Sequence, residues 1–371
     1  MIEKKVTNSK QNEIVCNNCG AELFFEPGTD SLKCHYCGSI NKITVDIDKI
    51  SDAIEELDYN KYINEYDTAP KIEITTVKCN DCGAETTFDT NVVSDKCDFC
   101  GSPLISKEAH TSQIIAPKAM LPFKVSKKEG FELYEKWIKG LWFAPNGLKK
   151  QSRQTDDLSG IYTPFWTYDS DTYTEYSGQR GDYYYTTETY YENGQQRTRQ
   201  VRHTNWRYVS GRVSNYFDDV MVHASNSLPR KYVSRLEPWD LQNLVPFNPK
   251  YLAGFKSETY RVALPDGFTY AKSKMEPVII ASVRRDIGGD EQRISNMVTH
   301  YNNTSFKHIL LPVWLSTYKY KDKIYRFLIN GRTGNVQGER PWSWIKITLA
   351  VLAAASIIGG IYWYSEVYMQ Y

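Results

Sequence analysis

Two stretches of the chain place apolar side chains at the spacing of an amphipathic helix. In the first, Ser126 and Glu129 have the spacing of a capping box. Apolar residues then recur on one face, at positions 131, 134, 137, 138 and 141. This pattern predicts a helix that begins after Ser126 and ends near Gly140. Residues 266 to 286 show a second helical pattern, which stops at Gly288 and Gly289.

A third apolar pattern lies among acidic residues between positions 46 and 67. Ile47, Ile50, Ile54 and Leu57 recur at helical spacing, and aspartate or glutamate occupies many of the positions between them. We therefore expect residues 46–75 to form an acidic helical linker. Its apolar stripe would pack on one of the cysteine-rich ribbons that flank it or on a partner.

The middle of the chain alternates aromatic or β-branched residues with polar ones. From Gly160 to Ala224 there are 11 tyrosines, two tryptophans and two phenylalanines among threonine, serine and arginine. This composition predicts strands. Turn signals at Gly178 to Gly181, at Asn193-Gly194 and at Gly211 divide the run into an antiparallel meander. Residues 306 to 330 predict two further strands joined by a turn at residues 320–323.

A weak internal repeat runs through this region. Residues 161–166 match residues 309–314, with Pro164 and Trp166 corresponding to Pro312 and Trp314. The segment at 121–123 likewise resembles the one at 244–247. The repeat predicts that residues 109–340 form a mostly antiparallel α+β domain that is either a duplication or a single unit with a short chance match.

The last apolar stretch is different, because it has no polar face. Residues 347–364 are 18 consecutive uncharged positions, long enough as a helix to cross a hydrocarbon core. A buried core helix is the alternative. Aromatic residues at both ends favour a transmembrane helix at 345–364. These aromatic residues are Trp342, Trp344, Tyr362, Trp363 and Tyr364.

The charges that flank this helix predict its orientation. Arg326, Arg332, Arg340 and Lys346 precede it, and Glu366 follows it. The positive-inside rule therefore leaves the N-terminal bulk in the cytoplasm and residues 365–371 as a short non-cytoplasmic tail. Small residues four apart, such as Ala355 and Gly359, would support helix pairing and a homo-oligomer.

Cysteine spacing brings metal chemistry into the picture. The eight cysteines form four C-x-x-C pairs, in which 14 residues separate the two pairs of each half, and the whole pattern repeats after 63 residues. Two such pairs complete a tetrahedral site of four thiolates, and a glycine after each pair permits the tight turn. The predicted metal ligands are Cys16, Cys19, Cys34, Cys37, Cys79, Cys82, Cys97 and Cys100.

Two other roles for the cysteines are disulfides and thioredoxin-like redox chemistry. The N-terminus lacks a signal-peptide core, which favours a reducing compartment over disulfides. The pairs also lie in turns rather than at the start of a helix, unlike redox motifs. We therefore expect two structural Zn²⁺ ions, held by a zinc ribbon at residues 1–45 and another at 76–108.

The distribution of charge along the chain bears on whether the partner is a nucleic acid. Residues 1–110 hold 11 lysines, no arginine and 20 acidic residues, a net charge of −9 that two zinc–thiolate sites lower to about −13. Such a surface repels phosphate. The arginines of the middle domain lie among tyrosines and tryptophans, a pattern that single-stranded nucleic acid or the polar face of a sheet would both explain. They are Arg197, Arg199, Arg202, Arg207 and Arg212.

No catalytic motif is present in the sequence. The chain has no Gly-Lys dipeptide, which excludes a Walker A loop, and neither H-E-x-x-H nor G-x-S-x-G occurs. The six histidines are scattered, and His35 lies where four cysteines already satisfy a metal. Asp218 and Asp219 favour a turn over a catalytic pair. We expect no enzyme, with an unrecognised active site in the tyrosine-rich domain as the remaining alternative.

These features together resemble a bacterial family of TFIIB-type zinc-ribbon-containing membrane proteins. The resemblance rests on both ribbons and on the segments 160–169, 255–260, 306–314 and 330–334. No helical repeats of the general transcription factor follow, so its function does not carry over. The resemblance implies recruitment to membranes beside phage-shock-type or SPFH (flotillin-like) proteins.

We thus expect a membrane-anchored adaptor or scaffold that faces the cytoplasm and acts in envelope maintenance or stress. A nucleic-acid-binding protein tethered to the membrane is the second hypothesis. It is the less favoured one, because the overall charge is only +1 and the ribbons are acidic.

Overall fold

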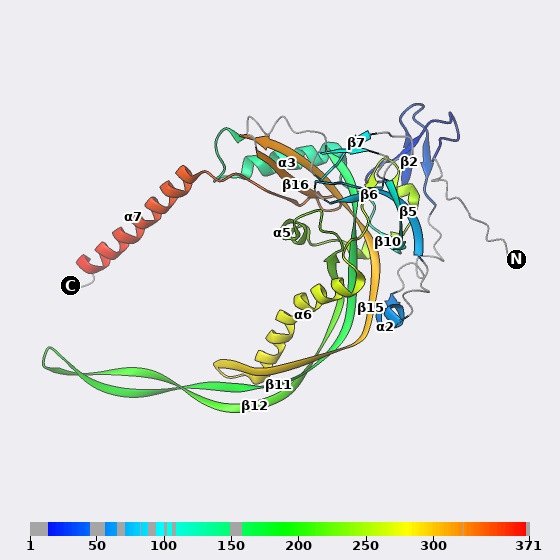
Figure 1. Cartoon of the computed structure of the whole chain (residues 1–371). Helices are drawn as coiled ribbons and strands as arrows, with labels where there is room; N and C mark the ends of the chain where they lie inside the picture. The colour runs from blue at the N-terminus through cyan, green and yellow to red at the C-terminus, as the bar shows by residue number, and fades with distance from the viewer. Residues whose placement is uncertain are drawn as a thin grey trace.

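The computed structural model describes residues 14–44, 56–64, 71–81, 83–87, 94–99, 102–105, 109–148, 158–321 and 323–368. These residues form an α+β structure dominated by one long, curved sheet (Figure 1). Small sheets lie at the N-terminal side, and an apolar helix extends from the C-terminal side. The mixed, sheet-rich class predicted from the sequence is therefore confirmed.

Three unusually long strands build the central sheet: β11 (Ser159–Glu192), β12 (Gln195–His223) and β15 (Glu291–Tyr320). β11 pairs antiparallel with both of the others. Shorter strands attach along their free edges. They are β4 (Leu57–Asp58), β10 (Ala119–Met120) and β16 (Lys323–Asn330) on β15, β14 (Lys256–Ser257) on β11, β13 (Val245–Pro246) on β10, and β17 (Val336–Gly338) on β16.

The predicted meander is wrong, because β11 and β12 form a single long hairpin. Its turn lies at Asn193 and Gly194, whose φ angles of 52° and 78° suit a two-residue hairpin turn, as predicted. Gly178 and Gly211 lie inside strands instead. A Cβ at Gly178 would come within 2.3 Å of the carbonyl oxygen of Arg293, so this glycine permits close strand contact.

The two segments of the internal repeat face each other at the centre of the sheet. Ile161 pairs with Val313 and Phe165 with Ile309 in the antiparallel β11–β15 ladder. Each segment also carries a short parallel strand, β14 on β11 and β10 on β15. The matching segments thus occupy equivalent places, and the duplication itself stays a prediction.

Both predicted helices are confirmed. α3 (Lys127–Gly140) begins with the expected capping box, in which Ser126 accepts from the backbone of Glu129 and the Glu129 carboxylate accepts from the backbone of Ser126. α6 (Leu264–Ile287) lies inside the curve of the sheet and buries one face against it (Figure 1). Between β12 and α6 the described residues also form four short helices: α5 (Arg230–Val233), η2 (Ser234–Leu236), η3 (Leu241–Asn243) and η4 (Pro249–Leu252).

The acidic linker contacts the main sheet rather than a ribbon. Of its four predicted apolar positions, only Leu57 falls within the described residues, and it lies in β4, paired with Phe306, not in a helix. Positions 47, 50 and 54 lie outside them. A short helix, α2 (Tyr59–Asn64), follows, and Tyr62 packs edge-on against Phe306 at 5.1 Å between ring centroids. Pairing with β15 overrides the local helical pattern here.

The C-terminal helix α7 (Trp344–Tyr368) is long and apolar enough to cross a membrane. Its span Trp344–Glu366 has a mean hydropathy of 1.9, and none of its most apolar stretch is buried in the protein. An apolar helix with no buried face is not a core helix, because a core helix owes its composition to packing. This supports a single membrane anchor.

The N-terminal strands form three small sheets. The first contains β1 (Leu23–Phe25), β2 (Ser31–Cys34) and β3 (Ile40–Lys42). The second joins β5 (Lys71–Lys78) to β6 (Glu85–Thr87) and β9 (Ala109–Ile115), and the third pairs β7 (Ser94–Lys96) with β8 (Pro103–Ile105). β5 and β9 thus join residues that our division placed in the linker and in the α+β domain.

Candidate metal centre

The four cysteines of the first ribbon come together. Their sulfur atoms all lie within 4.8 Å of one another. Cys16 Sγ is 3.6 Å from Cys37 Sγ, and Cys19 Sγ is 3.5 Å from Cys34 Sγ. Four sulfurs at about 2.3 Å from a tetrahedral zinc ion are about 3.8 Å apart. The group could therefore hold a metal ion of this size.

The backbone around each cysteine pair forms the same tight loop. Cys16 N–H donates to the carbonyl of Ala21 at 2.7 Å, and Gly20 N–H donates to the carbonyl of Cys16 at 2.8 Å. The second pair repeats both bonds, from Cys34 to Ser39 and from Gly38 to Cys34. Gly20 and Gly38 have φ angles of 73° and 75°, which explains why glycine follows each pair.

Ser39 polarises the thiols of this group. Its hydroxyl lies 2.8 Å from Cys16 Sγ and 3.2 Å from Cys37 Sγ. This contact lowers the pKa of Cys37 to about 5 and also lowers the pKa of Cys16. A backbone N–H at Ala21 acts to lower the pKa of Cys19, but desolvation and the neighbouring sulfurs raise it to about 12. The thiolate form that a metal needs is thus favoured at two ligands, and a cation would favour it at the others.

The second ribbon shows the same backbone loops as far as the structure describes it. Cys79 and Cys97 are buried, and each donates its N–H five residues onward, to Ala84 at 2.8 Å and to Ser102 at 2.7 Å. Gly83, with a φ of 74°, donates to the carbonyl of Cys79. Cys82 and Cys100 lie outside the described residues, so the second set of four ligands stays a prediction.

The first ribbon is docked on the main domain. Phe25 N–H donates to the carbonyl of Ala253 at 3.0 Å, and the Phe25 ring meets Tyr251 edge-on at 5.1 Å. Gly28 N–H donates to the carbonyl of Phe123 at 2.9 Å. The ribbon's apolar residues join the core around α3, so part of the folding energy of this ribbon comes from the domain.

The second ribbon contacts residues 256–259, which closely follow the residues Tyr251 and Ala253 that contact the first ribbon. Thr259 N–H donates to the carbonyl of Glu85 at 3.2 Å, and Lys256 Nζ lies 2.9 Å from a carboxylate oxygen of Asp98. Thr87 donates its hydroxyl to the carbonyl of Ser257 at 3.2 Å. Residues 251–261 therefore contact both ribbons, and both are part of one body with the sheet.

His35 and Ser39 lie close to the cysteines of the first ribbon in the sequence. His35, excluded as a ligand from the sequence, stacks on Phe24 with ring centroids 4.6 Å apart. Ser39 was missed by the sequence reasoning. A signal existed, because the second C-x-x-C of each ribbon continues with Gly-Ser, at residues 34–39 and 97–102.

The arginines proposed for nucleic-acid contact are engaged within the sheet. Arg199 lies 3.0 Å from Glu188, Arg197 lies 2.9 Å from Glu192, and the guanidinium of Arg202 lies over the ring of Tyr183 at 4.3 Å. Arg207 and Arg212 have carboxylate partners at 3.6 and 3.3 Å, Asp182 and Glu175. Cross-strand pairing is thus the role that the geometry shows for these side chains.

A cluster of carboxylates surrounds Lys307 beneath the linker. Lys307 Nζ lies 3.1 Å from Glu56 and 2.9 Å from Asp219. Desolvation and the contact with Glu56 raise the pKa of the buried Asp169 to about 7, and the contact with Asp169 lowers that of Glu56 to about 2. Asp218 joins Glu56 and Asp169 in the same group. Lys307 offsets part of their charge, and its contact with Glu56 holds the residue before β4 to the sheet.

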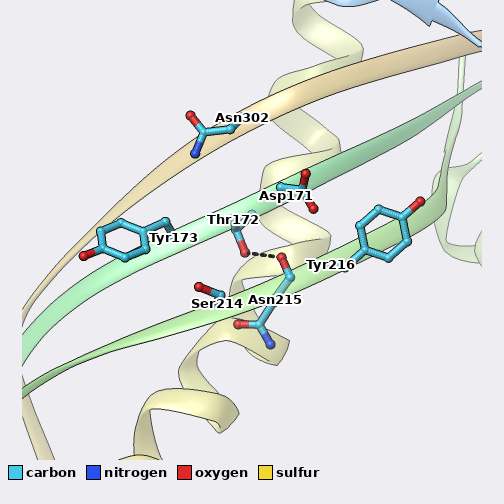
Figure 2. A pocket seen from close by; sticks show the side chains of 7 residues that line it. All are labelled: Asp171, Thr172, Tyr173, Ser214, Asn215, Tyr216 and Asn302. Carbon is cyan, nitrogen blue, oxygen red and sulfur yellow. Dashed lines mark hydrogen bonds between the residues drawn. The ribbon is translucent and has the colours of Figure 1, made fainter.

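A shallow polar pocket of about 460 Å³ opens on the long strands (Figure 2). Figure 2 shows Thr172 bonded to the backbone of Asn215 at 3.0 Å, with the rings of Tyr173 and Tyr216 at opposite ends. Asp171 is the one carboxylate in its lining. The lining offers hydrogen bonds but pairs no nucleophile with a base.

Comparison with known proteins adds one relative. No family model matches the chain, and no solved structure matches it. The uncharacterized protein YdjG of Bacillus subtilis (strain 168) is 27% identical over 347 residues, which cover 88% of this chain and 89% of that protein. The two chains are therefore similar along nearly their whole length. This similarity identifies neither an activity nor a partner.

Proposed function

We propose that this protein is a membrane-anchored adaptor or scaffold, with its bulk in the cytoplasm and two structural zinc ions that stabilise its ribbons. The observation that carries the proposal is the outer part of the β11–β12 hairpin, residues 182–205, which we name the arm. β15 pairs with β11 only as far as Gly181 and Glu291, so the arm projects as two strands alone (Figure 1).

The arm offers a large exposed surface with little net charge. It contains three carboxylates and three arginines. Tyr184, Tyr185 and Tyr191 are 49%, 61% and 74% exposed. Tyrosine supplies large contact area at low entropic cost, which makes it a frequent anchor of protein interfaces. A two-stranded hairpin is marginally stable alone in water, so a partner would stabilise it.

The two faces of the arm differ, as the pairing register shows. One face holds all three carboxylates. On this face Arg199 lies opposite Glu188, and Arg197 lies opposite Tyr190. The other holds tyrosine, threonine and glutamine, with Arg202 as its single charge. A surface of tyrosine and threonine favours a protein partner over phosphate.

Other observations support the remaining features of the proposal. The basic residues before α7 favour a cytoplasmic body. The similar backbone loops of the four cysteine pairs favour a second zinc ion. A role in envelope maintenance or stress, with phage-shock-type or SPFH proteins as partners, follows from the family resemblance and is part of the proposal.

In-cell crosslinking tests which part recruits partners. A photoreactive amino acid would replace Tyr191 in the arm or Tyr36 in the first ribbon, which is 85% exposed. We expect crosslinks to specific proteins from position 191. Crosslinks from position 36 alone would move the partner site to the acidic ribbons.

A shortened arm provides the matched variant. Deleting residues 185–192 and 195–202 joins Tyr184 to Asn193 and Gly194 to His203, so the turn and the register are kept. Partners should be lost while membrane attachment persists. The control variant replaces Thr187 and Thr189 with serine. Both residues lie on the same face of the arm as Tyr191, and the arm keeps its length. Partners that survive the deletion would contradict the proposal.

Metal analysis tests the zinc sites. The intact chain should contain two equivalents of zinc, and C37S and C100S should each lose one. A wild-type value of one equivalent would contradict the second site.

A further inference from the structure

The start of α7 is fastened to the body by a loop that comes some 200 residues earlier in the chain. Residues 141–148, which follow α3 and which we name the basal loop, lie against it. Ser343 N–H donates to the carbonyl of Phe143 at 2.8 Å. Lys346 Nζ donates to the carbonyls of Trp142 and Ala144, at 3.1 and 2.9 Å. The first turn of α7 is therefore hydrogen-bonded to the body of the protein.

Large indole rings are exposed on both sides of this junction. Trp142 of the basal loop is 79% exposed, and Trp342 and Trp344 are 51% and 78% exposed. A bilayer interface suits exposed indoles, because the ring is apolar and its N–H is a hydrogen-bond donor. Since Lys346 binds the carbonyl of Trp142, this ring lies at the level where α7 begins.

Basic side chains outnumber acidic ones around the junction. Lys136 and Lys139 lie near the end of α3, and Arg340 and Lys346 flank the start of α7, while Glu135 pairs with Lys139 at 2.9 Å. The Arg340 guanidinium lies over the Trp342 ring at 4.2 Å. Basic residues near a bilayer gain about 1 kcal/mol each from anionic lipids.

A cavity of about 830 Å³ lies beside the contacts of Lys346 with the basal loop and is lined by the end of α3, this loop and the first turns of α7. Leu141, Leu148 and Leu349 line it with apolar surface, and Lys139 and Lys346 add positive charge. Leu349 is about 7.5 Å along the helix from Trp344, the depth at which headgroups give way to acyl chains. Apolar walls with a cationic rim match a phospholipid.

We propose that the basal loop and the first turns of α7 form one membrane-contact surface that binds anionic phospholipid, with Trp142 inserted at the interface. This inference rests on the proposed membrane anchor. It goes beyond anchoring, because it places part of the body against the bilayer and predicts a preference for anionic headgroups.

The test uses the full-length chain in liposomes, either of phosphatidylcholine or with phosphatidylglycerol added, and measures tryptophan quenching by lipids brominated near the headgroup. Four of the nine tryptophans (Trp142, Trp342, Trp344 and Trp363) would be near the bilayer, so W142F should lower the quenched signal by about a quarter. W206F is the control and should leave it unchanged. K136Q/K139Q should reduce the extra quenching that phosphatidylglycerol produces.

Alkaline carbonate extraction separates the two proposals. If the protein resists extraction but W142F leaves quenching unchanged, the contact surface is wrong and the anchor stands. If carbonate releases the protein, both are wrong. If quenching at Trp142 occurs equally without phosphatidylglycerol, the preference for anionic lipid is overturned.

Discussion

The two parts of β11 are both rich in tyrosine and threonine but have different surroundings. The body half, residues 159–181, lies between β12 and β15 and packs on α6. The arm half, residues 182–192, has β12 as its one neighbouring strand among the described residues. Tyr162 and Tyr168 are fully buried in the first half, whereas Tyr191 is 74% exposed in the second.

The buried tyrosines have internal partners for their hydroxyl groups. Tyr168 donates to the carbonyl of Leu264 at 2.7 Å, and Tyr162 accepts from the backbone N–H of Phe123 at 3.3 Å. Burial raises the pKa of both hydroxyl groups above the usual value for tyrosine. The comparison shows that one residue type builds a core where a second layer covers the sheet and a surface where none does.

The largest expected difference comes from removing a ring in each half. Y168A should lower the free energy of unfolding by about 3–5 kcal/mol, because it leaves a cavity and removes the hydrogen bond from the Tyr168 hydroxyl to Leu264. Y185A, in the arm, should change it by less than about 0.5 kcal/mol. Thermal unfolding of the detergent-solubilised protein measures both. Equal effects would mean that the arm is part of the cooperative core.

Glycine substitutions sharpen the same contrast. G178A forces a Cβ against the Arg293 carbonyl, so we expect a loss of about 2–3 kcal/mol in the body half. At Gly194 no atom lies within 4 Å of an added Cβ, and the cost is the strain of its positive φ. Because the tip of the arm can fray alone, G194A should leave the global melting temperature unchanged. A large global shift for G194A would contradict this independence.

The buried Asp169 of the body half predicts a pH dependence. Its pKa is raised from 3.8 to about 7, so its contribution to stability is fully present below pH 3.8 and is lost as the pH rises through 7. Going from pH 6 to pH 8 should lower the free energy of unfolding by about 1 kcal/mol. The lowered pKa of Glu56 stabilises the fold above pH 4.5, and this contribution is lost as the pH falls from 4.5 through about 2, below this window.

Melting temperatures at pH 6 and pH 8 measure this dependence. D169N should flatten it, and the matched arm variant D182N should not. An unchanged slope in D169N would assign the dependence to another group.

The smallest effect is expected for the arm arginines. Replacing Arg197, Arg199 and Arg202 with glutamine removes two exposed ion pairs and the contact of Arg202 with the Tyr183 ring, each worth less than about 1 kcal/mol. Stability and binding to single-stranded DNA at about 150 mM salt should both change little. Submicromolar DNA binding that disappears in this variant would favour the nucleic-acid hypothesis over the adaptor.

Local rules predicted the elements whose signals are contained in a few consecutive residues. The capping box at Ser126 started a helix, Asn193-Gly194 made the hairpin turn, and the glycine after each described cysteine pair adopted a positive φ where the structure shows it. The apolar C-terminal helix was equally clear. In each case the interaction partners are neighbours in sequence, so the pattern carries the geometry.

Only the tertiary structure decided what depends on distant partners. Gly178 is a strand residue because β15 approaches it, and Leu57 is a strand residue because it pairs with Phe306. The docking of both ribbons on residues 251–261 joins segments more than 150 residues apart. Aromatic and β-branched residues predicted strands across residues 160–224, where β12 and nearly all of β11 lie. Which of their tyrosines are buried depended on where β15 and α6 begin and end, because burial is set by the layers that pack on a strand and not by the strand's own sequence.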